Sequence, residues 1–256
     1  MYENYEKLIE LLLNYDLTTV MFKNNYHYNG ILEHVNYEQG IKYLELILNE
    51  FPNIFSEHII EFVKLNDKIG FPKKYIYNIN NTQIDCSPSS LRYIYHSLLI
   101  LKYYKEKKLN EIVELGCGYG GLFLAISFFS NILEINIEKY YMIDLPIVCK
   151  LISKYLELNK EFISTKYEIL ESTNYGSDLH SKDLFFISNY CFSEIDKIHR
   201  DLYIENLFTK INSGFVIWQT SFTSFEYVDK IFKNNLTSEE HPQTGNETLK
   251  NYFVYF

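Results

Sequence analysis

A glycine-rich turn carries the clearest chemical signal in the sequence. It reads Glu114-Leu-Gly116-Cys-Gly118-Tyr-Gly120-Gly121 and lies between an apolar segment that predicts a strand and one that predicts a helix. Glycines allow a sharp turn and a close approach of a ligand to the backbone. The start of the following helix offers unpaired N–H donors. This pattern predicts the binding site of a nucleotide-like cofactor.

Two cofactors fit this turn. Its glycines match the G-x-G-x-x-G pattern of dinucleotide-binding folds and also the E/D-x-G-x-G-x-G pattern of proteins that use S-adenosylmethionine (SAM). Glu114 favours SAM, because that cofactor has no pyrophosphate for the carboxylate to repel and has an ammonium group for it to hold. The position of the turn, well inside the chain, favours SAM too. We expect SAM as cofactor and S-adenosylhomocysteine (SAH) as product, bound by Glu114, Gly116, Cys117, Gly118, Tyr119 and Gly120.

Asp144 is the second element of this predicted site. It ends the strand predicted at residues 140–144, where nucleoside-binding sheets place an acid that accepts both ribose hydroxyls. The alternative is a helix cap, because Leu145 and Pro146 open the next predicted helix and Asp is a favoured capping residue. The order of turn and acid favours ribose binding, with Leu145 beside the cofactor.

Three residues are candidates for a general base. Methyl transfer is an in-line displacement, and a hydroxyl acceptor has a high pKa, so a group that takes its proton should help. Glu194 closely follows the fourth predicted strand, although it could instead be a capping carboxylate. His241 lies in the polar segment 238–246, which is either a cover for the acceptor or an ordinary surface turn. His199 follows Glu194 by five residues and is the third candidate.

Further polar residues could contact the cofactor or the acceptor. Asn189 and Tyr190 directly follow the fourth predicted strand, and the Tyr190 ring could lie near the sulfonium. Arg92 has a planar fork that suits the cofactor carboxylate or an acceptor phosphate, the alternative being a surface ion pair. The other arginine, Arg200, we interpret as a surface residue.

A metal site is not expected. Glu194, Asp196 and His199 resemble a cluster of ligands, but residues two apart on a helix do not face one direction. The four cysteines are widely spaced without a CxxC pair, which argues against structural zinc and indicates reduced thiols. A divalent metal in catalysis remains an alternative that we do not favour.

Two regions of different pattern must position these residues. Residues 1–108 show helical periodicity and predict a mainly helical N-terminal region that acts as a lid or a homodimer interface. From 109 to 256 strands and helices alternate, which predicts an α/β domain with a mostly parallel sheet and helices on both faces. Strands are expected at residues 111–115, 140–144, 166–170, 183–188, 214–218 and 252–256, and helices are expected at about 195–210 and 225–234.

Composition excludes several classes of function. The 256 residues carry a formal net charge of −9, so nucleic acid is a poor ligand. No apolar run approaches the roughly 18 residues of a membrane span, and the acidic N-terminus does not resemble a signal peptide. We expect a cytoplasmic protein, in the host cytoplasm if its Asn-, Lys-, Ile- and Tyr-rich composition reflects a viral genome.

The chain resembles class I SAM-dependent methyltransferases and, more narrowly, the sugar O-methyltransferases of polysaccharide and glycan gene clusters. The resemblance rests on Ser87-Pro-Ser-Ser-Leu-Arg-Tyr93, Val113-Glu-Leu-Gly-Cys-Gly-Tyr-Gly-Gly-Leu122, Tyr140-Tyr-Met-Ile-Asp-Leu-Pro146 and Ser188-Asn-Tyr-Cys-Phe-Ser-Glu194, with a weaker stretch at 241–246. These stretches span residues 87–256. The glycine turn is general to the superfamily, whereas the Asp-Leu-Pro and Phe-Ser-Glu stretches are more particular.

The resemblance implies a Rossmann-like sheet of seven strands with SAM across the ends of the first two. It also implies an acceptor sugar, nucleotide-linked or within a glycan, whose hydroxyl is methylated during glycan biosynthesis. One alternative is an NAD-dependent sugar oxidoreductase or epimerase, but no Tyr-x-x-x-Lys pair follows the fourth predicted strand at a suitable position. The other is a SAM-binding module without catalytic activity.

Overall fold

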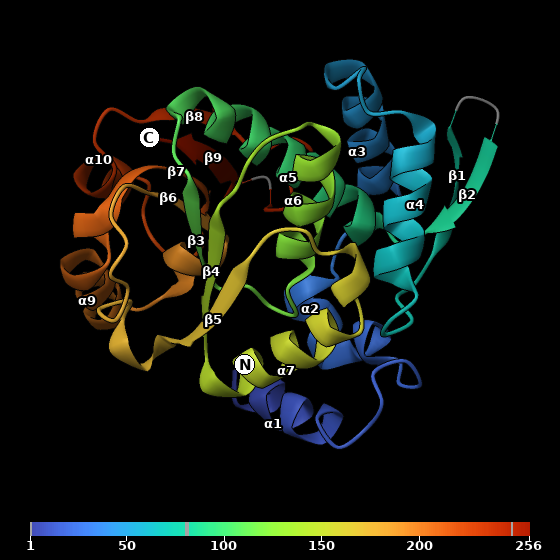
Figure 1. The fold of residues 1–256 in the computed structure, drawn as a ribbon, viewed down its shortest axis with the longest axis horizontal. Coiled ribbons are helices and arrows are strands. Elements are labelled where there is room, and N and C mark those ends of the chain that lie inside the picture. The colour runs from blue at the N-terminus through green and yellow to red at the C-terminus, as the bar shows by residue number, and fades with distance from the viewer. Residues whose placement is uncertain (1, 80–81, 247) are drawn as a thin grey trace. The chain divides into compact units, whose positions relative to one another are not determined.

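The computed structural model describes residues 2–79, 82–246 and 248–256 (Figure 1). The chain packs into two compact units. The helical unit contains residues up to Leu101, Gly118–Glu134 and Lys150–Ser164, and the sheet unit contains Lys102–Cys117, Ile135–Cys149 and Thr165–Phe256. The glycine turn passes from the sheet unit to the helical unit between Cys117 and Gly118. The division into domains 1–108 and 109–256 stays a prediction, because compact packing does not show which segments fold independently.

The helical unit begins with the helices drawn in blue and cyan in Figure 1. They are α1 (Tyr2–Leu12), the 3-10 helix Phe22–Asn24, α2 (Tyr26–Leu32), α3 (Tyr37–Glu50) and α4 (Ser56–Asp67). An antiparallel hairpin of β1 (Tyr75–Ile79) and β2 (Thr82–Cys86) follows. The remaining elements are α5 (Pro88–Lys107), α6 (Gly121–Ile132), α7 (Pro146–Glu157) and the 3-10 helix Lys160–Phe162, with α5 and α7 each contributing to both units.

Polar caps in the sequence set the start of several helices. Asn36 and Gln39 form a capping box at α3, since each side chain accepts a hydrogen bond from the backbone N–H of the other, at 2.9 Å in both cases. Asn25 accepts from the His27 N–H at the start of α2. These bonds satisfy donors that the first turn of a helix leaves unpaired.

An aromatic cluster that encloses a charge forms part of the core of the helical unit. The Tyr119 ring packs against Phe22 and Tyr155, and its side chain is fully buried. The Lys23 ammonium lies 4.1 Å from the centre of this ring and donates to the Asn66 carbonyl at 2.7 Å. Burial is the main reason that the pKa of Lys23 falls to about 8.

The sheet unit is built on seven strands in the order β5-β4-β3-β6-β7-β9-β8. They are β3 (Glu111–Leu115), β4 (Lys139–Asp144), β5 (Tyr167–Glu171), β6 (Leu184–Asn189), β7 (Ile211–Gln219), β8 (Leu236–Glu239) and β9 (Asn251–Tyr255). The first five strands of this order run parallel, and β9 is antiparallel to both β7 and β8. The predicted α/β fold class, a mostly parallel seven-stranded sheet with N-terminal helices, is confirmed. It is the class I methyltransferase fold.

The central strands are apolar because both of their faces are covered. Phe186, Val216 and Trp218 are fully buried and belong to one cluster with Phe192 and Phe232. Continuous apolar runs are typical of parallel strands that are buried on both sides. A rigid, buried sheet of this kind fixes the positions of the loops at its carboxyl edge, where ligands bind in α/β folds.

Two predicted elements differ in the structure. The helix expected from about residue 195 to residue 210 is instead α8 (Cys191–Glu194), α9 (Lys197–Asn206) and the 3-10 helix Phe208–Lys210. Asp196 causes the break, because its carboxylate accepts the N–H groups of Ile198 and His199 and so starts a new helix. Glu194 therefore ends a short helix instead of beginning a long one.

The helix expected at about 225–234 is shorter, as α10 (Glu226–Ile231), and the 3-10 helix Ser172–Asn174 follows β5. Within the described ranges, no helix combines the length and the apolar character that crossing a membrane requires.

Candidate functional site

Gly116 begins the glycine turn in a conformation that other residues rarely adopt. It follows β3 directly and has a φ of +81°. A Cβ on this residue would lie 2.3 Å from the Cys191 Cβ, so the first residue of α8 packs directly against the turn. This close contact brings the loop after β6 to the end of β3.

The Asp144 carboxylate reaches the same turn from the end of β4. One oxygen accepts the Cys117 N–H at 2.6 Å, and the other accepts the Leu145 N–H at 2.8 Å. Asp144 therefore stabilises both the turn and the start of α7. A carboxylate has about four acceptor positions, so these two bonds are compatible with binding the hydroxyls of a ribose.

The Glu114 side chain points into the core of the sheet unit. It is 2% exposed, and its carboxylate accepts a hydrogen bond from the Tyr140 hydroxyl at 2.8 Å. Burial raises the pKa of Glu114 to about 8, and the Tyr140 hydrogen bond only partly opposes that rise. Glu114 thus supports the turn from the core of the sheet unit.

Glu114→Gln should change how stability depends on pH. At pH values between the ordinary pKa of a glutamate and about 8, the folded protein keeps a proton on Glu114 that the unfolded chain has lost. The contribution of Glu114 to the free energy of unfolding therefore falls as the pH rises through this range. Glutamine does not titrate and still accepts from Tyr140. Between pH 5 and pH 8, the free energy of unfolding of the variant should therefore rise by about 3 kcal/mol relative to that of the wild type. Urea unfolding across this range measures the difference, and a pH-independent difference would contradict the raised pKa.

The rest of the turn lies in the helical unit. A Cβ on Gly118 would come 2.9 Å from the Leu32 side chain, at the end of α2. The Arg92 guanidinium donates to the Leu32 carbonyl at 2.6 Å and is buried, so the surface ion pair considered for it is wrong. Tyr119 is a core residue whose hydroxyl contacts Asn66, and the following Gly120 has a φ of +91°.

The backbone is strained directly after β6, at Tyr190. Asn189 and Tyr190 are half-buried, and Tyr190 has a φ of +70°, which is unusual for a residue with a large side chain. The Tyr190 hydroxyl donates at 2.5 Å to Glu240, a carboxylate that is only 2% exposed. Asn251 also donates to Glu240, at 3.0 Å. The segment after β8 thus anchors the loop after β6.

Two serines fix α8 at the carboxyl edge of the sheet. The Ser188 hydroxyl donates to the Leu115 carbonyl at 2.9 Å and accepts the Phe192 N–H at 3.0 Å. The Ser193 hydroxyl donates to the Tyr190 carbonyl and accepts the Gln219 N–H. These bonds connect the ends of β3, β6 and β7 to the helix that carries Glu194.

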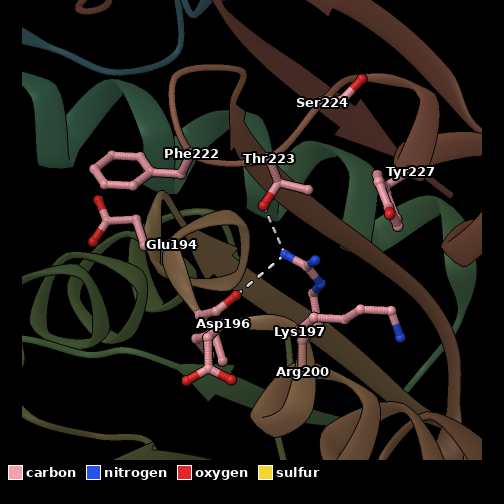
Figure 2. A pocket seen from close by; sticks show the side chains of 9 residues that line it. Glu194, Asp196, Lys197, Arg200, Phe222, Thr223, Ser224 and Tyr227 are labelled. Carbon is pink, nitrogen blue, oxygen red and sulfur yellow. Dashed lines mark hydrogen bonds between the residues drawn. The ribbon is translucent and has the colours of Figure 1, made fainter.

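Glu194 lines a pocket of about 330 Å³ at this edge (Figure 2). The pocket is formed by Glu194, Ile195, Asp196, Lys197, Arg200, Phe222, Thr223, Ser224 and Tyr227. With its amide nitrogen facing α8, Gln219 donates to the Glu194 carboxylate at 2.6 Å and to the Tyr190 carbonyl at 3.3 Å. The carboxylate is thereby oriented by a residue at the end of β7.

The two histidine candidates occupy different places. His199 is exposed on α9, where its Nδ1 lies 2.7 Å from the Tyr175 hydroxyl and its Nε2 lies 3.7 Å from Asp196. It does not line the pocket around Glu194. His241 is exposed in the segment after β8, directly beside the buried Glu240. The part of the chain that the structure describes holds no group of three His, Cys, Asp or Glu side chains arranged for a metal ion.

Sequence reasoning missed three residues of this site. Gln219 and Glu240 have no local motif, since their roles depend on contacts with distant residues. Arg200 is 5% exposed, so its interpretation as a surface residue is wrong. The signal that could have revealed it is the scarcity of arginine, because a chain that uses lysine almost everywhere has only Arg92 and Arg200.

Two buried thiols flank Asp144. Cys117 donates weakly to the Glu114 and Ile143 carbonyls, and Cys149 donates to the Asp144 and Leu170 carbonyls at 3.3 Å. Burial raises the pKa of Cys149 to about 12 and that of Cys117 well above its usual value. Neither thiol therefore ionises near neutral pH.

Comparison with protein family models gives no match, and comparison of the sequence with curated proteins gives none either. Solved structures of similar fold include the methyltransferase domain of bacterial CtHen1, at 11% identity and a TM-score of 0.47, covering 62% of this chain and 96% of that one. A SAM-dependent methyltransferase from Aquifex aeolicus has 16% identity and a TM-score of 0.41, covering 60% of this chain and 87% of that one. One from Clostridium acetobutylicum has 10% identity and a TM-score of 0.38, covering 57% and 56%. The fold assignment rests on the strand order of the sheet itself.

Proposed function

We propose that the protein is a SAM-dependent O-methyltransferase that methylates a sugar hydroxyl in glycan biosynthesis. The sugar, whether nucleotide-linked or part of a glycan, is proposed from the resemblance of residues 87–256 to sugar O-methyltransferases. The cofactor and the reaction are proposed from the fold and from the side chains at the carboxyl edge of its sheet.

One observation carries this proposal most strongly. The antiparallel strand β9 is inserted between β7 and β8, at the edge of an otherwise parallel sheet. Dinucleotide-binding sheets are built from two parallel halves in the order 3-2-1-4-5-6 and have no such insertion. The arrangement therefore favours SAM over NAD and weakens the alternative of a sugar oxidoreductase or epimerase.

The residues around Asp144 fit SAM. A carboxylate at the end of the second strand suits a ribose diol, and the backbone N–H of Cys117 shows that this carboxylate is aimed at the glycine turn. Leu145 lies between Asp144 and α7. On the other side of β3, Asn189 ends β6 and Tyr190 follows it. We propose that these residues bind the cofactor, and the role of Arg92, which belongs to the helical unit, stays a prediction.

When bound, SAM would supply a methyl group on a sulfur that keeps the electron pair of the broken bond. The chain must hold the acceptor hydroxyl in line and remove its proton. Glu194 is our first choice as the base, because it lines a pocket and Gln219 orients its carboxylate. His241 and His199 remain the second and third candidates.

Asp144→Asn should weaken SAM binding about 100-fold, because one oxygen that accepts a ribose hydroxyl is lost. Isothermal titration calorimetry with SAM, SAH and NAD measures the effect. Glu171→Gln is the matched control, since Glu171 ends the neighbouring strand in register with Asp144 and is exposed. Unchanged SAM affinity in Asp144→Asn would limit the role of Asp144 to stabilising the turn and the start of α7.

The same titration tests the proposed function on the unaltered protein. Micromolar binding of SAM and SAH without binding of NAD is the expected result, with or without magnesium. Methyl transfer to nucleotide sugars and to glycans is then screened. Binding of NAD instead would support the oxidoreductase, and binding of SAM without turnover on any sugar would favour a non-catalytic module. Dimerisation through the N-terminal helices and a cytoplasmic location stay predictions.

A further inference from the structure

Arg200 forms the centre of the pocket that Glu194 lines. Figure 2 shows its guanidinium rising from α9 between Thr223 and the end of α8. One nitrogen donates to the Thr223 hydroxyl at 2.7 Å and to the Ile195 carbonyl at 3.2 Å. The guanidinium carbon lies 5.5 Å from the centre of the Tyr227 ring. The positive charge is thus held rigidly by neutral groups.

Among the ion pairs of the described residues, none includes Arg200, although its side chain is buried. A buried charge without an ion-pair partner is unfavourable unless other groups compensate it. Both of these hydrogen bonds come from one guanidinium nitrogen, whereas a guanidinium offers five N–H groups in a planar fork. An oxyanion is the group that this fork recognises best.

The other charged residues of the pocket are engaged elsewhere. Lys197 pairs with Asp201 at 2.5 Å, and Asp196 caps α9 through its carboxylate. The Glu194 carboxylate is held by Gln219, and Figure 2 shows it on the Phe222 side, away from the guanidinium. The pocket therefore presents a cation at its centre and a proton acceptor at one end.

We propose that the acceptor carries an oxyanion, a carboxylate or a phosphate, which binds Arg200 while a neighbouring hydroxyl faces Glu194. This inference rests on the proposed function and narrows its substrate to acidic or phosphorylated sugars. Arg200 and Glu194 line the same pocket, and the Ile195 carbonyl that binds Arg200 belongs to the residue after Glu194. The volume of about 330 Å³ lies at the lower end of ligand pockets, which suits a single ring better than a whole nucleotide sugar.

A buried tryptophan contacts two residues that line the pocket and can report on ligand binding. Trp218 is the single tryptophan of the chain, and its ring lies 6.0 Å from the Arg200 guanidinium. Its indole N–H donates to the Thr223 carbonyl at 3.0 Å. A ligand that binds Arg200 and Thr223 should therefore change Trp218 fluorescence.

The test compares three ligands on the unaltered protein in the presence of SAH. Glucose 6-phosphate and glucuronate are the anionic probes, and glucose is the neutral control. We expect at least one anionic probe to change Trp218 fluorescence and to bind about tenfold or more tightly than glucose. Preference for one anion identifies its source as phosphate or carboxylate. Equal binding of all three, or no binding of either anion, would overturn the inference.

Variants then locate the site. Arg200→Lys keeps the charge but loses the planar fork, so it should weaken anion binding about tenfold while SAH binding is unchanged. Lys233→Gln, which removes an exposed positive charge outside the pocket, should leave both unchanged. Circular dichroism and thermal unfolding confirm that each variant is folded. If Arg200→Lys does not fold, the comparison of the three ligands on the unaltered protein still decides.

The outcomes separate this inference from the proposed function. SAM binding with methyl transfer to neutral sugars, but without anion preference, would overturn the role of Arg200 and leave the methyltransferase standing. Anion binding that is lost in Arg200→Lys, in a protein that does not bind SAM, would leave the anion site standing and overturn the methyltransferase.

Discussion

Gly116→Ala should abolish detectable SAM binding and lower the free energy of unfolding by about 3 kcal/mol. A non-glycine residue in the left-handed region costs about 1–2 kcal/mol, and overpacking adds a similar amount. The new Cβ would overlap Cys191, with centres 2.3 Å apart, so the turn and α8 must separate. That movement displaces the Cys117 N–H from Asp144. Urea unfolding and calorimetric titration with SAM measure the two effects.

Gly176→Ala is the matched control for this prediction. Gly176 also has a positive φ, of +76°, but a Cβ there would meet the flexible end of Leu207 at 3.0 Å. This variant should lose about 1–2 kcal/mol of stability and keep its affinity for SAM. Equal losses of affinity in both variants would mean that instability alone, and not the geometry of the turn, governs cofactor binding.

Glu194→Gln should lower kcat for methyl transfer by about 10²- to 10³-fold, because a general base contributes on that scale. Glutamine keeps the size of the side chain but cannot take the proton of the acceptor hydroxyl. SAM affinity should stay within about twofold of the wild-type value, since Glu194 is not assigned to the cofactor. Steady-state kinetics on an identified acceptor, with calorimetry for SAM, separates the two quantities.

Three controls make the assignment of the base specific. Glu205→Gln changes an exposed carboxylate on α9, the helix after the one that carries Glu194, and should leave kcat unchanged. His241→Gln and His199→Gln should each lower kcat by less than about tenfold. If His241→Gln removes turnover and Glu194→Gln does not, the base is His241, and Glu194 serves only to position α8.

The sheet was predictable because the residue types of its strands reflect their burial. Phe186 and Val216 lie in strands buried on both faces, which require runs of apolar residues. The glycine turn and Asp144 were equally readable, since each combines a particular residue type with a place at the end of such a strand. Local sequence therefore predicted the fold class and the part of the candidate site that lies in the sheet unit beside β3 and β4.

The rest depends on contacts that no local pattern records. Strand β8 was missed because its four residues are exposed and show no alternation. The break between α8 and α9 depends on one capping carboxylate, Asp196, within a stretch that otherwise favours helix. Arg200 could be recognised as buried only once Thr223, which follows it by 23 residues, was placed against it.

The alkylation rates of the Cys117 and Cys149 thiols can measure local opening of the site. Thiolates, and not thiols, react with alkylating reagents, and burial keeps both residues protonated near neutral pH. Modification therefore requires the turn and the start of α7 to open, so its rate reports how often the loops beside Asp144 separate from the sheet. A ligand that closes these loops slows the alkylation even if it produces no spectral change. Alkylation followed by mass spectrometry can thus measure how often the site opens.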